Sequence, residues 1–347
     1  MKKATKIISL FVVILLATAA CQQNPALPPE SDTPTAEQTS APAVISADNA
    51  DQLKAVHSAS VDSGAVRATW TADSSTVWID GGFSVSLYDS TIGEMIAQFN
   101  PGEYAVIYDV SPDGKTAAYS DDGMEIRLYD VLAQADTITI TPDFPYSSVF
   151  FNADGSLLGA ASVLDIKIVT WDTSSGVEKS SLRGFETAAP VYSASFGADG
   201  KTLMWISRGT VQPMDIASQT MGPILSHEDF VVAQALSPDG NVVATAAAGT
   251  IGGKSSPLLT LWNAHSGEIL RQIAMPEYYS SIAFSPDSGL IAAGTQDTVI
   301  LFSNPHGDEV YRFDNGEAIS SIAFSPDGTK LITCGDSGTI NIYMVGE

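Results

Sequence analysis

Short apolar runs alternate with turns along most of this chain. Seven of the runs end in a turn built around Asp, usually followed by Gly; these turns hold Asp73, Asp113, Asp154, Asp199, Asp239, Asp287 and Asp327. Consecutive aspartates are separated by 40, 41, 45, 40, 48 and 40 residues. A period near 40 with strand-like runs between turns is typical of a β-propeller with one four-stranded blade per repeat. The sequence therefore predicts an all-β fold of seven four-stranded antiparallel blades.

The last repeat illustrates the pattern of one blade. Residues 320–324 alternate small or polar residues with apolar ones, as a half-buried strand does. Pro326 suits the second position of a type I turn, and Asp327 and Gly328 suit the next two. Residues 330–334 and 339–344 form two more strands, and a fourth is missing. Residues 52–58 have similar patterning, so we expect this N-terminal strand to pair in the last blade and close the ring.

The repeats resemble those of bacterial WD-repeat propellers, over residues 48–347. The resemblance lies in the Ser-Pro-Asp-Gly turns and in strands that end in segments such as Leu87-Tyr88-Asp89, Leu128-Tyr129-Asp130, Trp171-Asp172 and Leu261-Trp262-Asn263. It implies a rigid platform that binds other proteins, and it does not imply an enzyme. Trp-Asp occurs once and Gly-His is absent, so the hydrogen-bonded Asp-His-Ser-Trp network of typical WD repeats is not predicted.

The N-terminus has the pattern of an export signal. Lys2, Lys3 and Lys6 precede an apolar stretch that is shorter than the roughly 20 residues of a spanning helix. Residues 16–21 look like a bacterial lipobox, with Thr18 where Leu is usual. The resemblance implies that residues 1–20 are removed and that Cys21 carries the lipid, including palmitate, as a membrane anchor. The alternative is cleavage after Ala19, which would leave a soluble secreted protein.

Residues 21–47 are rich in Pro, Ser, Thr and Ala, with five prolines. Such a segment buries too little apolar surface to fold, so we expect a disordered tether between Cys21 and a propeller that spans residues 48–347. The predicted location is the outer side of the cell membrane, or the periplasm or outer membrane.

Composition narrows the function. The chain has 16 basic and 40 acidic residues, for a net charge of −24, which excludes nucleic acid as a partner. Cys334 is interpreted as a small buried residue. Nucleophile-elbow, zinc-protease, Cys-x-x-Cys and Gly-x-Gly-x-x-Gly motifs are absent, so we predict no catalytic residue, metal or cofactor. His265 and His306 occupy equivalent turns and are interpreted as turn residues. We expect a monomer.

One face of the predicted ring is a candidate binding surface. Each loop from an outer strand to the next inner strand carries an acid, and aromatic residues lie beside several of them. The candidate residues are Asp62, Glu103, Tyr104, Asp143, Tyr146, Glu186, Asp229, Phe230, Glu277, Tyr278 and Glu317. Carboxylates and aromatic faces both attract cations, which predicts a protein or peptide partner of basic character. The alternative is that these are solvated loop residues of an acidic chain.

Two other functions stay open. Some exported propellers are lactonase-like hydrolases with a site at the central channel. The predicted inner strands present one ionisable residue, Asp109, which is a poor basis for hydrolysis or metal binding, so the binding platform is favoured. A purely structural spacer is the third alternative.

Overall fold

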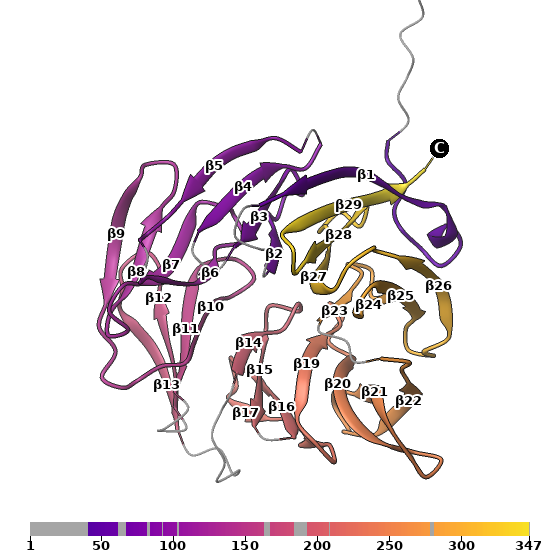
Figure 1. Cartoon of the computed structure of the whole chain (residues 1–347). Helices are drawn as coiled ribbons and strands as arrows, with labels where there is room; N and C mark the ends of the chain where they lie inside the picture. Colours follow the sequence, from indigo (N-terminus) through magenta and orange to yellow (C-terminus); the bar gives the residue numbers. More distant parts are fainter. Residues whose placement is uncertain are drawn as a thin grey trace, which may run out of the picture. The chain divides into compact units, whose positions relative to one another are not determined.

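The described chain from residue 42 onward is a ring of seven β-sheets around a centre (Figure 1). The computed structural model describes residues 41–61, 67–81, 84–91, 93–102, 104–162, 167–183, 193–207, 209–277 and 281–346. Six sheets have four antiparallel strands, and one has its outer strand in two pieces. The predicted seven-bladed propeller is confirmed. In the described part of the chain, no helix has the length and apolar character needed to cross a membrane.

The first three blades follow each other in sequence, from inner to outer strand. Blade 1 consists of β2 (Arg67–Trp70), β3 (Thr76–Asp80), β4 (Val85–Asp89) and β5 (Met95–Phe99). Blade 2 consists of β6 (Val106–Val110), β7 (Thr116–Ser120), β8 (Ile126–Asp130) and β9 (Ala135–Ile140). Blade 3 consists of β10 (Ser148–Phe151), β11 (Leu157–Ser162), β12 (Lys167–Asp172) and β13 (Glu178–Arg183).

The remaining blades complete the ring. Blade 4 consists of β14 (Ser193–Phe196), β15 (Thr202–Ser207), β16 (Thr210–Asp215) and the two pieces β17 (Thr220–Met221) and β18 (Leu225–Ser226). Blade 5 consists of β19 (Val231–Leu236), β20 (Val242–Ile251), β21 (Lys254–Asn263) and β22 (Ile269–Ala274). Blade 6 consists of β23 (Ser281–Phe284), β24 (Leu290–Gly294), β25 (Thr298–Ser303) and β26 (Glu309–Asp314). Blade 7 consists of β27 (Ile319–Phe324), β28 (Lys330–Gly335), β29 (Thr339–Val345) and the N-terminal β1 (Leu53–Ser60).

The N-terminal strand closes the ring, as the sequence predicted. β1 pairs antiparallel with β29, from Leu53 opposite Val345 to Ser60 opposite Thr339, and the indigo and yellow strands lie side by side in Figure 1. A short 3-10 helix, Ala50–Gln52, precedes β1. Packing begins even earlier, within the predicted tether: Ile45 is buried, and its N–H donates to the carbonyl of Gly328 at 2.9 Å.

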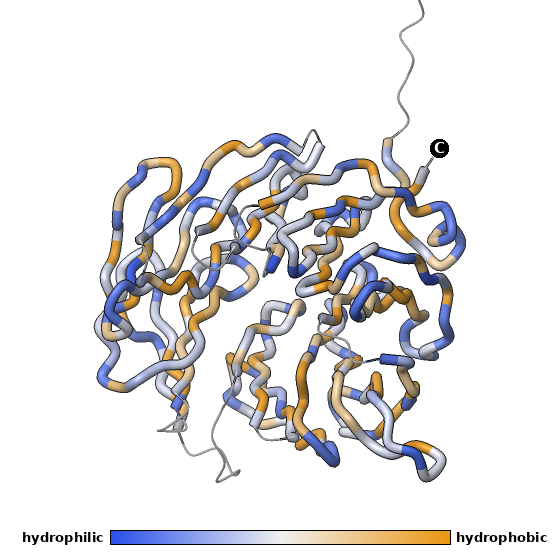
Figure 2. Tube along the Cα trace, in the orientation of Figure 1, coloured by the Kyte–Doolittle hydropathy of each residue, from blue (hydrophilic) through white to orange (hydrophobic). Residues whose placement is uncertain are grey.

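The core lies between neighbouring blades. Leu259 of blade 5 packs in one buried cluster with Ile291 of blade 6, and Leu301 of blade 6 packs in another with Leu331 of blade 7. Middle strands are therefore apolar and outer strands polar. In Figure 2 the hydrophobic colour follows β24 and β25, whereas the outer strand β26 is largely hydrophilic. Cys334 is buried in this core, as expected, and burial raises the pKa of its thiol to about 12.

The seven repeated turns share one hydrogen-bond pattern. Each turn aspartate accepts, at 2.9 to 3.1 Å, the N–H of the residue two positions later. These acceptors are Asp73, Asp113, Asp154, Asp199, Asp239, Asp287 and Asp327. The residue directly after each turn aspartate has a positive φ, for example +72° at Gly328. This conformation favours glycine, because glycine has no Cβ. Ser74 and Ser288 take the same conformation without that advantage.

The antiparallel order gives the ring two different faces. The turn face carries the repeated turns and the turns between third and fourth strands. The loop face carries the hairpins between second and third strands and the loops that lead into the next blade. Blade 5 has the longest hairpin, because β20 and β21 have 10 residues each. This explains the 48-residue spacing between Asp239 and Asp287.

Candidate functional site

The loop face holds the candidate binding residues that the sequence indicated. Four of them, Asp62, Glu103, Glu186 and Tyr278, lie outside the described residues. The described ones come from different blades, and their surroundings differ. Two aromatic residues and three acids are exposed to solvent, and one of these acids, Asp143, is paired with a lysine. Tyr146 and Glu317 are partly buried and engaged in contacts within the fold.

Tyr104 and Phe230 are the exposed aromatic residues. Each lies seven residues before the first residue of its repeated turn, in the loop that leads into β6 or β19. Tyr104 is 87% exposed and Phe230 is 55% exposed. Exposed aromatic side chains of this size are favourable anchors for a protein partner, because binding removes much apolar surface from water.

Tyr104 borders a shallow hollow of about 390 Å³ on blade 2. Asp121, Asp122 and Arg127 also line it. Arg127 compensates part of the negative charge, since its guanidinium lies 3.1 Å from the carboxylate of Asp121. The backbone N–H groups of Glu125 and Met124 hydrogen-bond to Asp122 and lower its pKa, so this carboxylate is charged at neutral pH. The hollow thus combines an exposed ring with a fixed negative charge.

Asp143 and Tyr146 each contact a residue of blade 2 or blade 3. The Asp143 carboxylate lies 2.6 Å from Nζ of Lys167, a buried lysine whose ammonium also lies 4.5 Å from the ring centre of Phe144. The Tyr146 hydroxyl donates to the carbonyl of Glu125 at 3.0 Å. These two residues stabilise the loop face, and neither presents an uncompensated group of the kind that the sequence suggested.

The three remaining acids also differ. Asp229 and Glu277 are exposed, and neither forms an ion pair with another described residue. Asp229 accepts the N–H of Phe230 at 2.8 Å. Glu317 instead accepts hydrogen bonds from the N–H and hydroxyl of Ser337, across the β28–β29 hairpin. Burial raises the pKa of Glu317, but the hydrogen bonds from Ser337 and Thr339 outweigh that effect and lower it. Among the described candidate acids, Asp229 and Glu277 are therefore exposed without an ion pair, whereas Asp143 is exposed but paired with Lys167.

The channel carboxylate Asp109 is held by the three blades around it. Its Oδ1 lies 3.2 Å from Arg67 Nη2, and its Oδ2 accepts the N–H of Phe151 at 2.8 Å. Arg67 also donates to the carbonyl of Tyr108 at 2.7 Å. Burial raises the pKa of Asp109, and the Arg67 charge and the N–H of Phe151 oppose that rise. Sequence reasoning missed Arg67, because it began the first inner strand one residue too late.

A polar network links β20 and β21 of blade 5 with the loop before β19 and with Gly209 of blade 4. The Trp262 Nε1–H donates to the Thr245 hydroxyl at 2.8 Å, and that hydroxyl lies 2.8 Å from His227 Nε2. His227 Nδ1 lies 3.3 Å from the carbonyl of Gly209. With the proton on Nδ1, the donors form a continuous chain from Trp262 to Gly209. Burial lowers the pKa of His227, while the carbonyls of Gly209 and Leu225 oppose this.

Blade 7 has a network at the same place with different residues. Asn315 Oδ1 accepts from the Thr333 hydroxyl at 2.7 Å and from the Tyr343 hydroxyl at 3.0 Å. His227 and Asn315 both lie ten residues before the first residue of the repeated turn, and Thr245 and Thr333 both lie eight after it. The arrangement in blade 5 supplies the His, hydroxyl and Trp positions of the WD-repeat network. The sequence did not predict it because Ser226, not Gly, precedes the histidine.

Comparison with known proteins also indicates a WD repeat. Residues 307–343, which span β26 of blade 6, β27 and β28 of blade 7 and most of β29, match the WD40 family, described as WD domain, G-beta repeat. These observations support a WD-repeat propeller. Propellers of this kind generally serve as scaffolds for protein interactions. No curated protein matches the sequence. Among the described residues, no group of three or more His, Cys, Asp or Glu side chains is placed to hold a metal ion.

Proposed function

We propose that this chain is an exported, lipid-anchored binding platform that holds a basic protein or peptide on its loop face. The observation that carries the proposal is the exposure of Tyr104 and Phe230 at equivalent positions of blades 2 and 5. Interface hot spots are enriched in aromatic residues, and each of these two lies one or two residues before an inner strand that fixes its position.

Charge favours a basic partner. The chain has a net charge of −24, and Asp229 and Glu277 are exposed on the loop face. Asp122 adds a fixed carboxylate beside Tyr104. A surface of one sign steers oppositely charged proteins toward it and raises their association rate.

The proposal assigns no catalytic step to the chain. Asp109 is the ionisable residue that the sequence placed at the channel, and its oxygens are bound to Arg67 and to the N–H of Phe151. Both oxygens of Asp109 are therefore engaged, and a single carboxylate paired with a guanidinium is a poor basis for hydrolysis.

The anchoring part of the proposal rests on Cys21 and the preceding apolar stretch. Acyl chains contribute about 0.8 kcal/mol per buried methylene, so a lipidated Cys21 holds the protein on a membrane. Replacing Cys21 with Ser is expected to move the protein from the membrane fraction to the soluble fraction, or to leave an unprocessed precursor. Wild-type protein that takes up no label from a fatty-acid analogue contradicts lipidation.

Binding is tested with the full chain in detergent. Immobilised wild type and a Tyr104→Ala/Phe230→Ala variant are exposed to envelope extract, and captured proteins are measured by quantitative mass spectrometry. We expect the partner to be depleted at least about tenfold on the variant. Leu132→Ala is the matched control, because Leu132 is an exposed apolar residue on the turn face. Equal capture by wild type and the double variant would rule out the loop-face anchors.

A further inference from the structure

A groove opens on the turn face between blades 4 and 5, away from the surface proposed above. It forms where the outer strand of blade 4 is interrupted between β17 and β18. Pro213 lies opposite this interruption in β16 and has no N–H to donate to an outer strand. A single backbone bond remains there, from the N–H of Gly222 to the carbonyl of Pro213 at 2.8 Å. In the sequence, Pro213 and Gly222-Pro223 are the residues that indicate an interrupted outer strand, because proline and glycine both disfavour regular strand pairing.

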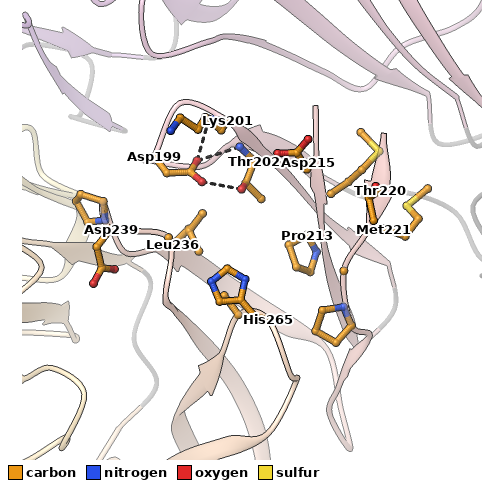
Figure 3. Close-up of a pocket in the computed structure, with 16 residues that line it drawn as sticks. Asp199, Lys201, Thr202, Pro213, Asp215, Thr220, Met221, Leu236, Asp239 and His265 are labelled. Atoms are coloured by element: carbon orange, nitrogen blue, oxygen red, sulfur yellow. Dashed lines mark hydrogen bonds between the residues drawn. The ribbon is translucent and has the colours of Figure 1, made fainter. Parts of the chain in front are cut away.

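The groove has a volume of about 500 Å³, within the range of pockets that bind small ligands and short peptide segments. Its apolar part consists of Leu236, Pro213 and Pro223, with the partly exposed Met221 at the rim (Figure 3). Leu236 comes from blade 5 and the others from blade 4, so the two blades form opposite walls.

Three carboxylates, one ammonium and one imidazole surround this apolar part: Asp199, Asp215, Asp239, Lys201 and His265. Asp199 uses both oxygens within its own turn, as the dashed bonds to Lys201 and Thr202 show in Figure 3. Asp215 accepts two bonds from Ser218 on one oxygen, Oδ1. Hydrogen bonds from Ser218 lower the pKa of Asp215.

Asp239 is held by its turn in the same way. Its Oδ1 accepts from the Ser237 hydroxyl and the Asn241 N–H, and its Oδ2 accepts from the Asn241 amide at 2.8 Å. Burial raises the pKa of Asp239, but these bonds outweigh that effect and lower it. Asp215 and Asp239 therefore stay ionised at neutral pH in fixed positions on the two sides of the groove.

We propose that this groove is a second binding site, for a peptide segment of a partner protein in which an aliphatic side chain is flanked by basic residues. The aliphatic side chain packs against Leu236 and the prolines, and the flanking cations lie near Asp215 and Asp239. The charge of the groove is complementary to such a segment, because three carboxylates face one ammonium. The groove is separate from the loop face, so a negative result for one of the two binding sites leaves the proposal for the other intact.

The probe is the peptide acetyl-Lys-Leu-Lys-amide, titrated into the full chain with methyl-labelled methionine in detergent. The Met221 methyl signal, assigned with Met221→Ala, reports on the groove. We expect a saturable shift at low salt that acetyl-Glu-Leu-Glu-amide does not produce and that acetyl-Lys-Ser-Lys-amide produces only weakly. The Asp215→Asn/Asp239→Asn variant is expected to weaken the affinity about tenfold, as the loss of two rim charges implies.

Asp113→Asn is the matched control. Asp113 occupies the same turn position in blade 2 as Asp239 does in blade 5, and it does not line the groove. Affinity equal to wild type in this control supports the proposal. If Asp113→Asn weakens binding as much as the groove variant, or if the basic and acidic peptides shift Met221 alike, the groove is not a specific site and the proposal is wrong.

Discussion

The hydroxyl of Ser74 accepts a hydrogen bond from the backbone N–H of Asp327 at 3.0 Å, joining the first and last blades. The two residues are 253 positions apart in sequence. Ser288 and Asp239 have the same relationship, at 3.1 Å, between blades 6 and 5. Ser74 and Ser288 are the two repeated-turn positions where serine replaces glycine at positive φ. The unfavourable backbone conformation therefore coincides with a hydrogen bond to the preceding blade's turn.

Ser74 provides a test of this relationship. Ser74→Ala keeps a side chain at positive φ and removes the acceptor, so we expect the unfolding free energy to fall by about 1 kcal/mol. Ser74→Gly removes the same acceptor but relieves the backbone, so its loss is expected to be smaller. Urea unfolding followed by tryptophan fluorescence measures both. A glycine variant that is less stable than the alanine variant would show that backbone conformation is unimportant here.

The blade 5 network predicts a pH dependence near neutrality. Burial lowers the pKa of His227 from 6.5, so the unfolded chain binds a proton at a pH where the folded chain does not. Stability is therefore complete above about pH 6.5 and is lost as the pH falls through the lowered value. His227→Asn is expected to remove this slope at a cost below about 1 kcal/mol at neutral pH, because an amide oxygen here can accept from the Thr245 hydroxyl as Asn315 accepts from Thr333.

Unfolding free energies measured between pH 7 and pH 5 test that slope. His265→Asn is the control, since His265 is an exposed turn residue that takes no part in the network. If wild type and His227→Asn lose stability in parallel over this range, other groups cause the pH dependence.

The ion pair between Arg67 of blade 1 and Asp109 of blade 2 predicts that substitutions of these two residues have strongly coupled effects on stability. Arg67→Ala leaves Asp109 partly buried beside Asp80 without its cation, and we expect a loss of about 2 kcal/mol. Adding Asp109→Asn restores much of this loss, because the amide oxygen still accepts the N–H of Phe151 and the buried charge is gone. A double-mutant cycle with thermal unfolding measures the coupling. Additive losses would mean that Arg67 does not neutralise Asp109.

The fold was predictable from sequence because its signals are local and repeated. Each turn aspartate accepts the N–H two positions ahead, so the turns form from neighbouring residues and recur at the blade period. The closing strand was also predictable, since residues 52–58 supply the strand that the last blade lacks. Interactions between blades were not, because the sequence shows neither Ser74 beside Asp327 nor Arg67 beside Asp109.

The sequence predicted where the candidate acids lie on the loop face, but not which of them are exposed. Alignment on the turns placed Glu317 and Asp229 at equivalent sites, yet Glu317 binds the Ser337 hairpin while Asp229 is exposed. Whether a loop acid is free depends on the neighbouring hairpin, whose residues differ from blade to blade. The groove between blades 4 and 5 escaped detection for a related reason, since it comes from one irregular outer strand and not from the repeat.

The exposed acids of the loop face give the last prediction, which concerns the rate of association with the partner captured by wild type. Asp229→Asn/Glu277→Gln removes two exposed charges that make no ion pair among the described residues, so the fold is expected to stay intact. We expect slower association at low salt with little change in dissociation, because rim charges act on encounter. Salt is expected to remove the difference, since charges farther apart than about 8 Å are screened at physiological ionic strength.

Glu317→Gln is the informative comparison. Its carboxylate binds the Ser337 hairpin, so this change is expected to affect stability more than association. Surface plasmon resonance at several salt concentrations separates the two rate constants. An association rate for Asp229→Asn/Glu277→Gln that equals wild type at low salt would show that these acids only solvate the loop face; an equal slowing by Glu317→Gln would show that overall negative charge, and not the exposed pair, steers the partner.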